Sequence, residues 1–503
     1  MKSKNLISTN KEVILVTILV LSILVKFINI SMPIFEGYIG RQIATANMTR
    51  NIYKGGSIFY PEIDSAPFPH YVMLEFPIYN IIIDGFYKVF GENEVWGRFV
   101  SLLCIIFATV FLFKIVKRYF NFDVAILSCI FFNLSPISLI YARAYQPDPM
   151  MLFSILAGLY FLDCWIDNQK NKYLLTSAVF FSIAFIIKII ALYVFLPIIF
   201  LFWYKNGKRF LCKPDFWFFA VICLVPSLIW YLHARAVALS PEIYRESTVW
   251  NIFKVWIVPS YWTKISFYKI FFKNFLGLLL TPIGVVFFFL GILRRNLNKR
   301  QLFFHVYMIS LLIYSFLLFK KMDLEYYYFA YLPVVSVFVA RGVEIFINNS
   351  FFKREFYVNK LSFLGIILVC LAFIFGYGHR GFVVPHYLED VQEVVDVVKA
   401  KTDTDDLVIT SIPILYYADR RGFIFDYEKK DIKEREYRWK TKFESNSPKE
   451  LLNFYINKGG VVFADTLNGK EEKYNEFFGY LKKKFKNIEY EPGKYIFCRV
   501  SGE

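Results

Sequence analysis

Residues 13–42 read VILVTILVLSILVKFINI-SMPIFEGYIGRQ, an apolar run that passes directly into a loop carrying an acid and a base. The run from Val13 to Ile30 is close to the roughly 20 residues that a helix needs to cross the hydrocarbon core of a bilayer. Lysines precede it, as in a secretory signal, but no small-residue cleavage site follows it. We therefore interpret it as a retained first membrane span.

Further apolar runs of spanning length follow along the chain, which is 57% hydrophobic. Together with the first they predict a polytopic α-helical membrane protein with about 11 spans. The pair within residues 173–204 leaves two alternatives open, because it forms either two spans or one bent helix plus a re-entrant segment. The further runs occupy residues 97–113, 124–140, 149–166, 173–187, 189–204, 216–234, 275–293, 302–319, 328–347 and 361–377.

Basic residues cluster between the apolar runs, and their distribution predicts how the chain is oriented. If residues 173–204 hold two spans, the strongly basic loops all fall on the same side as the N-terminus. The positive-inside rule then places the N-terminus in the cytoplasm, in a multi-pass protein of the plasma membrane. These loops also account for the formal net charge of +17, since they meet anionic lipid headgroups. The charge therefore does not indicate a nucleic-acid partner.

Three segments on the opposite, outer side are too long to be simple turns, namely residues 31–95, 235–273 and everything after about 378. We predict a transmembrane domain over residues 1–377, whose first outer loop is long, and an extracytoplasmic domain over residues 378–503. The second domain is rich in charge and reads as a small soluble α/β unit. Its helix and strand patterns lie at residues 391–399, 407–411, 448–457 and 461–464.

The first outer loop places charges at the level of the lipid headgroups. Glu36 and Arg41 lie only a few residues beyond the end of the first span, and the same loop supplies Arg50 and Glu75. Single charges at this depth are common interfacial residues, so none of the four indicates a site by itself.

The second outer loop is short and reads YARAYQPDP over residues 141–149. Prolines on both sides of Asp148 fix its backbone and begin the next helix, where the helix dipole alone favours an acid. Arg143 lies in the same loop. Two outer loops thus each bring an acid and a base to one membrane depth, as a site for a charged phosphate and an acceptor hydroxyl requires.

Two later places add candidates for binding a phosphate. Lys188 is the one charge in the middle of the apolar residues 173–202. At an outer turn it is either a lysine that extends to the interface or a ligand for a lipid phosphate. Glu325, Tyr326 and Tyr327 follow two lysines between later spans, where tyrosines form an aromatic belt or complete a phosphate pocket.

The two loop motifs resemble those of membrane glycosyltransferases with the C-type fold, in particular the protein O-mannosyltransferases and the lipid A aminoarabinose transferase (glycosyltransferase family 39-like). Three departures stand out: Glu36 occupies a position usually held by Asp, Gly40 replaces a tryptophan, and Leu324 and Glu325 stand where a histidine often precedes the paired tyrosines. The matching residues are Glu36-Gly-Tyr-Ile-Gly-Arg-Gln, Arg50-Asn51, Tyr60-Pro61, Glu75-Phe-Pro and Tyr141-Ala-Arg-Ala-Tyr-Gln-Pro-Asp-Pro.

The resemblance implies an activity and roles for these residues. A glycosyl group would pass from a polyprenyl-phosphate-linked sugar to an acceptor hydroxyl on a lipid, glycan or protein at the outer face, with inversion. Glu36 would be the general base, and Asp148 would support the acceptor or a metal. No cofactor is certain, and a divalent metal would take Glu36 and Asp148. The donor phosphate is predicted to contact Arg41, Arg143, Lys188, Tyr326 and Tyr327, with support from Arg50, Glu75 and Glu325.

The main alternative is a transporter or flippase for a lipid-linked or anionic substrate, which also places charges near membrane depth. Such proteins usually show repeated halves and broken helices near the midplane. The sequence shows no internal repeat, and transport has no need of a first outer loop of over 60 residues. We therefore favour a transferase.

Overall fold

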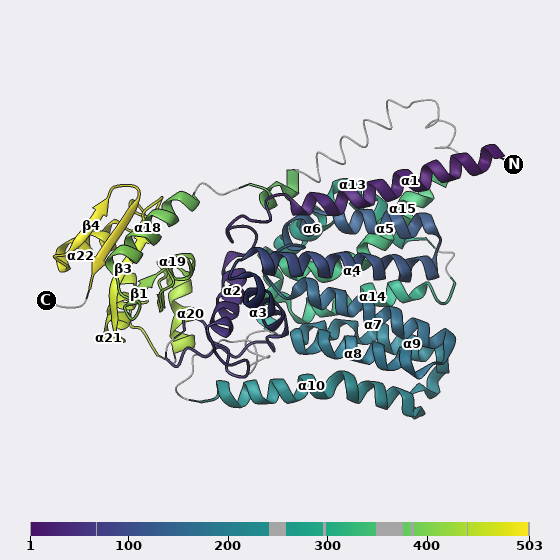
Figure 1. The fold of residues 1–503 in the computed structure, drawn as a ribbon, viewed down its shortest axis with the longest axis horizontal. Coiled ribbons are helices and arrows are strands. Elements are labelled where there is room, and N and C mark those ends of the chain that lie inside the picture. Colours follow the sequence, from purple (N-terminus) through teal and green to yellow (C-terminus); the bar gives the residue numbers. More distant parts are fainter. Residues whose placement is uncertain are drawn as a thin grey trace.

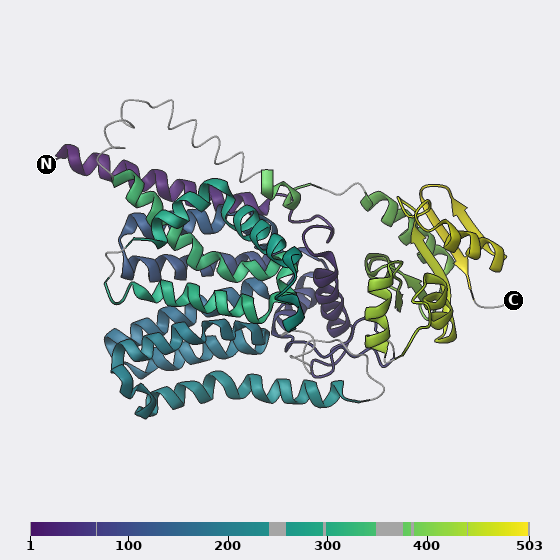
Figure 2. The same ribbon diagram turned by 180° about the vertical axis from the view of Figure 1, so that it is seen from behind.

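The computed structural model describes residues 2–66, 68–240, 258–294, 298–348, 376–383, 387–439 and 441–500. A bundle of long helices forms one end of the molecule, and a small α/β unit that begins at Tyr387 forms the other (Figure 1). The N-terminus lies at the far end of the bundle. Helices α2 (Ile39–Tyr53) and α3 (Ile78–Phe90) lie between the bundle and the α/β unit, as both views show (Figure 2).

The bundle is built from apolar helices, and in the part of the chain that is described six helical stretches are long and apolar enough to cross a membrane. These stretches are Val95–Tyr119, Asp148–Asn168, Ile189–Cys212, Pro214–Ala238, Ile265–Ile292 and Glu325–Asn348. Residues 361–375, which hold most of the last predicted span, lie outside the described residues. The individual helices are α1 (Lys2–Leu24), η1 (Val25–Phe27), α4 (Val95–Tyr119), α5 (Phe122–Leu134), α6 (Pro136–Tyr141), α7 (Asp148–Asn168), α8 (Asn171–Ile187), η2 (Ile189–Val194), α9 (Phe195–Asn206), η3 (Gly207–Cys212), α10 (Pro214–Ala238), η4 (Pro259–Tyr261), α12 (Ile265–Lys273), η5 (Asn274–Leu280), α13 (Thr281–Ile292), α14 (Leu302–Leu317), η6 (Phe319–Asp323), η7 (Glu325–Tyr331), α15 (Leu332–Asn348) and η8 (His379–Gly381).

Residues 171–206 form two antiparallel helices that reverse at Lys188. Lys188 has an extended backbone, with φ −152° and ψ 120°, which ends α8 before the 3₁₀ turn η2 begins. Its ammonium contacts Asp148 at the start of α7, whereas Phe202 of α9 lies 5.3 Å from Trp165 near the end of α7. The chain therefore crosses the bundle twice, and Lys188 lies at the end that faces the α/β unit.

Two glycines allow α13 and α15 to pack closely. A Cβ atom on Gly291 would overlap the carbonyl group of Phe338, and one on Gly342 would overlap that of Phe287. Helices in lipid gain packing energy where small residues let their backbones approach. These two glycines therefore allow the backbones of α13 and α15 to approach each other closely.

The predicted first outer loop contains two helices, α2 (Ile39–Tyr53) and α3 (Ile78–Phe90). Arg41, Ala44 and Asn47 recur at one-turn spacing along α2. All three line a cavity between the bundle and the α/β unit. Arg50 follows one turn later and faces the α/β unit instead. One face of α2 thus supplies both the cavity wall and a contact to the second unit.

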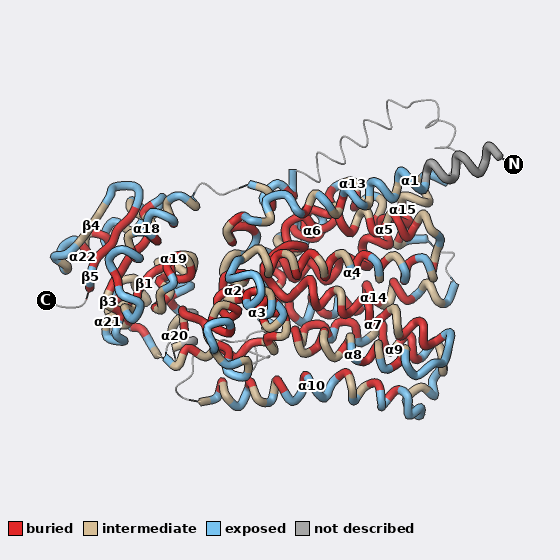
Figure 3. Tube along the Cα trace, viewed as in Figure 1, coloured by how far each residue is buried: buried red, intermediate tan, exposed pale blue. Residues whose placement is uncertain are grey.

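The α/β unit holds a five-stranded sheet in the order β2-β1-β3-β5-β4. Strand β1 is parallel to β2 and β3, and β5 is antiparallel to β3 and β4. Two clusters of buried side chains include residues of its strands. Figure 3 shows buried residues, in red, along the strands of this unit. Its elements are α18 (Tyr387–Lys401), β1 (Leu407–Thr410), α19 (Ile412–Ala418), β2 (Gly422–Ile424), α20 (Lys429–Trp439), α21 (Pro448–Asn457), β3 (Gly460–Thr466), α22 (Asn475–Lys484), β4 (Ile488–Glu491) and β5 (Tyr495–Arg499).

Candidate active site

Glu36 lies at the centre of a buried ion cluster at the end of the bundle that faces the α/β unit. One carboxylate oxygen pairs with Arg98 of α4, and the other lies 2.9 Å from the guanidinium of Arg143. All three side chains are fully buried. A buried carboxylate held by two guanidinium groups is strongly fixed in place, and removing it would leave both guanidinium groups without a counter-charge.

The two outer loops are joined through Gln42 and Arg143. The Gln42 side chain donates to the Glu36 carbonyl at 2.5 Å and accepts from the backbone N–H of Tyr145 at 2.8 Å. Arg143 also donates to the carbonyl of Ile28, just after the first helix. The two sequence motifs therefore form one rigid assembly, and Asp148 begins α7 directly behind it.

A cavity of about 1270 Å³ lies between this assembly and the α/β unit. Five of the residues predicted to form the site line it: Arg41, Glu75, Lys188, Tyr326 and Tyr327. They come from α2, from the segment before α3, from the turn at Lys188 and from η7. Residues separated by almost 290 positions in sequence thus meet on one wall.

Lys188 and Asp148 form an ion pair at this wall. The Lys188 ammonium donates to both Asp148 carboxylate oxygens, at 2.8 and 2.7 Å, and lies 5.1 Å from the centre of the Tyr326 ring. Tyr327 packs against Tyr326, with ring centres 4.7 Å apart. Lys188, which lines the cavity, is therefore held in place by a carboxylate and by an aromatic ring beside it.

A second ion pair, between Arg41 and Glu75, lies on the same wall. Both side chains are about one-sixth exposed, at 15% and 18%, so each is accessible from the cavity. Asp64 lies further along the wall, where Asn47 and Asn51 donate to its carboxylate. The cavity wall thus has cationic side chains that can bind an anion, and carboxylates lie beside these cations.

Glu36 and Arg143 were predicted to face the substrate, and the structure places them elsewhere. Neither lines the cavity, because Glu36 is enclosed between Arg98 and Arg143 in the interior. Glu36 and Asp148, which were named as the ligands if a metal binds, each pair with a different cation in the structure. Within the described ranges, no three His, Cys, Asp or Glu side chains gather as metal ligands.

Arg50 and Glu325 were predicted to support the site and instead hold parts of the fold together. Arg50 pairs with Glu92 at 2.6 Å and donates to the carbonyl of Tyr416 in α19 at 2.7 Å. Glu325 pairs with Arg380 at 3.1 Å and accepts from Tyr141 at 3.3 Å. Neither Arg50 nor Glu325 lines the cavity, although Tyr416 does.

The α/β unit is docked on the first outer segment through several polar contacts. Asp419 accepts from Lys54 at 2.8 Å. Burial raises the pKa of Asp419, but the hydrogen bond and charge of Lys54 outweigh this effect and hold the pKa below its usual value. Tyr417 donates to Glu94 at 3.2 Å. Burial raises the pKa of the Glu94 carboxyl, and the charge of Arg98 opposes this rise. The two units therefore share the cavity as one structure.

Two sets of functional residues were not found from the sequence. Arg98 lies inside a predicted span, and a charge within that apolar run was the signal that marked it. Lys430, Lys433 and Arg435 of α20 also line the cavity. Nothing in the sequence placed α20 against the membrane domain.

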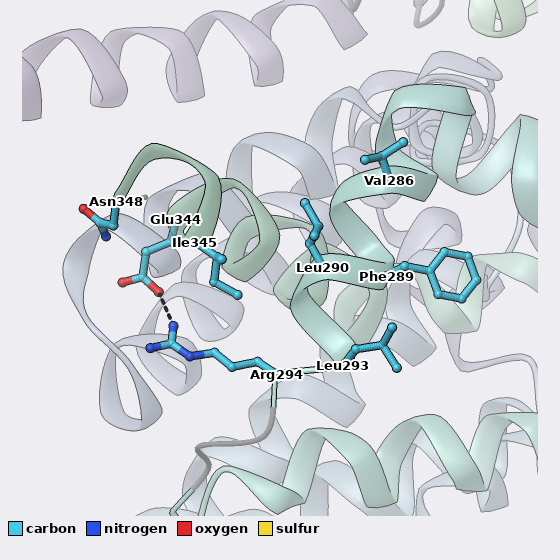
Figure 4. Close-up of a pocket in the computed structure, with 8 residues that line it drawn as sticks. All are labelled: Val286, Phe289, Leu290, Leu293, Arg294, Glu344, Ile345 and Asn348. Carbon is cyan, nitrogen blue, oxygen red and sulfur yellow. Dashed lines mark ion pairs between the residues drawn. The ribbon is translucent and has the colours of Figure 1, made fainter. Parts of the chain in front are cut away.

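A separate groove lies between α13 and α15, at the end of the bundle away from the α/β unit. Apolar side chains including Val286, Phe289 and Leu290 line it, and Arg294 points toward Glu344 across its end (Figure 4). The two charged groups are 3.8 Å apart. The groove contains none of the predicted site residues.

The whole chain shares its fold with membrane glycosyltransferases of known structure. It matches the apo structure of ArnT from Cupriavidus metallidurans with a TM-score of 0.64 and 11% identity, over 98% of each chain. ArnT bound to undecaprenyl phosphate matches with a TM-score of 0.61 and 10% identity, over 97% of this chain and 98% of that one. The oligosaccharyltransferase AglB from Archaeoglobus fulgidus, in complex with an inhibitory peptide and a dolichol-phosphate, matches with a TM-score of 0.53 and 12% identity, over 98% and 75%.

The sequence comparisons agree with the fold. Residues 75–230 match the family of dolichyl-phosphate-mannose-protein mannosyltransferases. An uncharacterized protein of Aquifex aeolicus (strain VF5) is 24% identical over 335 residues, which make up 64% of this chain and 62% of that protein. The predicted resemblance to membrane glycosyltransferases of the C-type fold is thus confirmed.

Proposed function

We propose that this protein transfers a glycosyl group from a polyprenyl-phosphate-linked sugar to an acceptor hydroxyl at the outer face of the membrane. The observation that carries the proposal is the cavity wall where Arg41 and Lys188 meet Tyr326 and Tyr327. Two of the solved structures with this fold contain undecaprenyl phosphate or dolichol-phosphate. The comparisons give no support for a transporter.

Arg41 and Lys188 are the groups that would bind the donor phosphate. Each is held by a carboxylate, Glu75 or Asp148, so both cations are already positioned before the donor enters. Positive groups that are fixed in advance stabilise the negative charge that develops on a leaving phosphate. A polyprenyl tail would remain in the bilayer beside the bundle while the phosphate enters the cavity.

Glu75 is the carboxylate that we assign as general base. It lies on the cavity wall and pairs with Arg41, and a phosphate that takes over Arg41 would release it. The acceptor oxygen then attacks the anomeric carbon, the bond from that carbon to the phosphate oxygen breaks, and Glu75 takes the hydroxyl proton. The products are the glycosylated acceptor and polyprenyl phosphate, and a single displacement inverts the anomeric centre.

Glu36 and Asp148 are positioning residues in this proposal. Glu36 holds Arg98 and Arg143, which join the two outer loops behind the cavity. Asp148 holds the ammonium of Lys188, a residue of the cavity wall, in place. The role of general base, which the resemblance assigned to Glu36, therefore passes to a carboxylate that a substrate can reach.

Donor consumption in lipid nanodiscs tests the proposed function. A panel of radiolabelled polyprenyl-phosphate-linked sugars is incubated with the wild-type protein, and release of polyprenyl phosphate is measured. The variant that combines Lys188→Gln with Asp148→Asn removes both charges of a buried pair, so that neither charge is left uncompensated. We expect the wild type to consume one donor and the double variant to be at least about 100-fold slower.

A folded wild-type protein that consumes none of the donors would contradict the proposal. Equal rates for the wild type and the double variant would show that the cavity wall is not the reaction site. The variant that combines Arg300→Gln with Asp163→Asn is the control, because it removes one cation and one anion from the ion cluster of Arg118, Asp163, Asp167 and Arg300 at the opposite end of the bundle and so leaves the net charge of that cluster unchanged. It should consume the donor at the wild-type rate.

A further inference from the structure

The cavity has a second group of cations, apart from Arg41 and Lys188. Lys320 belongs to η6, Arg235 to the last turn of α10, and Lys430 and Lys433 to α20 of the α/β unit. The membrane bundle and the α/β unit thus each contribute positive charge to one region. Lys321 and Arg435 also line it, and the acids among them are Asp323, Asp426 and Asp431.

These cations are not neutralised by ion pairs of their own. Throughout the described part of the chain, no ion pair joins Lys320, Lys430, Lys433 or Arg235 to an acid, whereas Asp426 is paired with Arg435 at 2.5 Å. Partial burial raises the pKa of Asp323, and the charges of Lys321, Lys430 and Lys320 oppose that rise. Lysines from both units therefore lie near Asp323, and six cations against three acids in this region leave an excess of positive charge.

The α/β unit is built so that α20 must face the cavity. Strands β1 and β2 are parallel, and the chain that leaves their carboxyl ends supplies Ile412, Ile424 and Asp426 to the cavity lining. Helix α20 begins three residues after Asp426. In open α/β sheets, ligands bind outside the carboxyl ends of the strands. This unit therefore forms a wall of the cavity, in addition to covering it.

We propose that Lys320, Lys430 and Lys433, with Arg235, form a second anion site that binds a negatively charged group of the acceptor. The assignment to the acceptor rests on the proposed function, in which Arg41 and Lys188 are taken by the donor phosphate. An acceptor that carries a phosphate or carboxylate would then be held between η6 and α20 while its hydroxyl reaches the anomeric carbon. The site selects acidic acceptors over neutral ones.

Binding of inorganic pyrophosphate tests the site directly. The protein is placed in zwitterionic nanodiscs with excess undecaprenyl phosphate, and binding of radiolabelled pyrophosphate is measured. The variant Lys430→Gln/Lys433→Gln changes two exposed side chains, so we expect it to fold normally and to bind pyrophosphate about tenfold more weakly. Lys429→Gln is the matched control, since Lys429 is exposed on the same helix but does not line the cavity. It should bind as the wild type does.

The role in acceptor binding is tested by comparing two reactions of the donor. Hydrolysis by water needs no acceptor, whereas transfer is measured with a total membrane lipid extract. The double variant should slow transfer about tenfold and leave hydrolysis unchanged. If both rates fall equally, or neither falls, the site does not bind the acceptor.

Three other outcomes would overturn the proposal. Unchanged pyrophosphate binding in the double variant would show that these lysines do not form an anion site. If nanodiscs rich in phosphatidylglycerol abolish pyrophosphate binding by the wild type, bilayer headgroups occupy the site and the acceptor role is wrong. If the wild type consumes no donor while pyrophosphate binding still depends on the lysines, the proposed function has failed and the anion site has another ligand.

Discussion

Glu36→Gln is expected to lower the stability of the protein by about 3–5 kcal/mol, because it leaves two buried guanidinium groups without a counter-charge. Arg98 and Arg143 both pair with this carboxylate, and all three side chains are fully buried. The measurement is the midpoint of thermal unfolding in detergent, followed by size-exclusion chromatography. Activity should fall in proportion to the loss of folded protein.

Glu92→Gln is the control for this prediction. Glu92 also pairs with an arginine, Arg50, but its side chain is one-third exposed, so we expect a loss of less than about 1 kcal/mol. If Glu36→Gln has the stability of the wild type and yet no transfer activity, Glu36 acts on the substrate. The base would then be Glu36, as the family resemblance implied, and the cluster with Arg98 and Arg143 would have to open during the reaction.

Glu75→Gln is expected to slow transfer by about 10² to 10⁴-fold while leaving the fold intact, since this is the usual contribution of a general base. The side chain keeps its shape, and its partner Arg41 is partly exposed to the cavity and tolerates the loss of a counter-charge. The measurement is kcat for the donor as a function of pH. In the wild type, kcat should fall at acidic pH because the general base must be deprotonated. The Glu75→Gln variant should lack this fall, because it has no carboxylate at this position.

The control for Glu75 is Glu325→Gln, which removes a carboxylate that lies outside the cavity and pairs with the half-exposed Arg380. Its transfer rate should remain within about twofold of the wild type, as expected for an exposed ion pair. A Glu75→Gln variant that keeps both the wild-type rate and its acidic limb would contradict the assignment of the base. Asp64 would then be the next carboxylate on the wall to examine.

Much of the membrane architecture is predictable because hydrophobicity acts over whole segments. The stretches Val95–Tyr119 and Asp148–Asn168 contain the spans predicted at residues 97–113 and 149–166. Breaks within apolar runs were harder to see, since propensity hardly distinguishes a continuous helix from a broken one. The run at 124–140 is interrupted at Ser135, and the run at 275–293 begins in the π-helical segment η5.

Some of the residues expected at the site line the cavity and others do not, and the difference has a physical reason. Sequence places charges at a membrane depth, and Lys188, Arg41 and Glu75 indeed reach one cavity. Whether a charge at that depth faces the cavity or the interior depends on partners from distant helices. Arg98 of α4 encloses Glu36, and no local pattern around Glu36 reveals this contact.

In the α/β unit, too, the sequence pattern predicts individual elements better than their positions relative to the rest of the protein. Strand β1 and helix α21 coincide with residues 407–411 and 448–457, where the hydrophobic pattern is strong. Helix α20 is strongly charged and has few apolar residues, so its pattern reads as solvent-exposed chain. Its position on the cavity follows from the direction of β2, which is set by pairing with β1.

The central claim is that the cavity wall at Arg41 and Lys188 binds the phosphate of a polyprenyl donor. The most direct test is a structure of the wild-type protein in nanodiscs with undecaprenyl phosphate. We predict that the phosphate lies within hydrogen-bonding distance, about 3 Å, of both Arg41 and Lys188. A phosphate bound instead in the groove beside Arg294, with the cavity wall unchanged, would contradict the account.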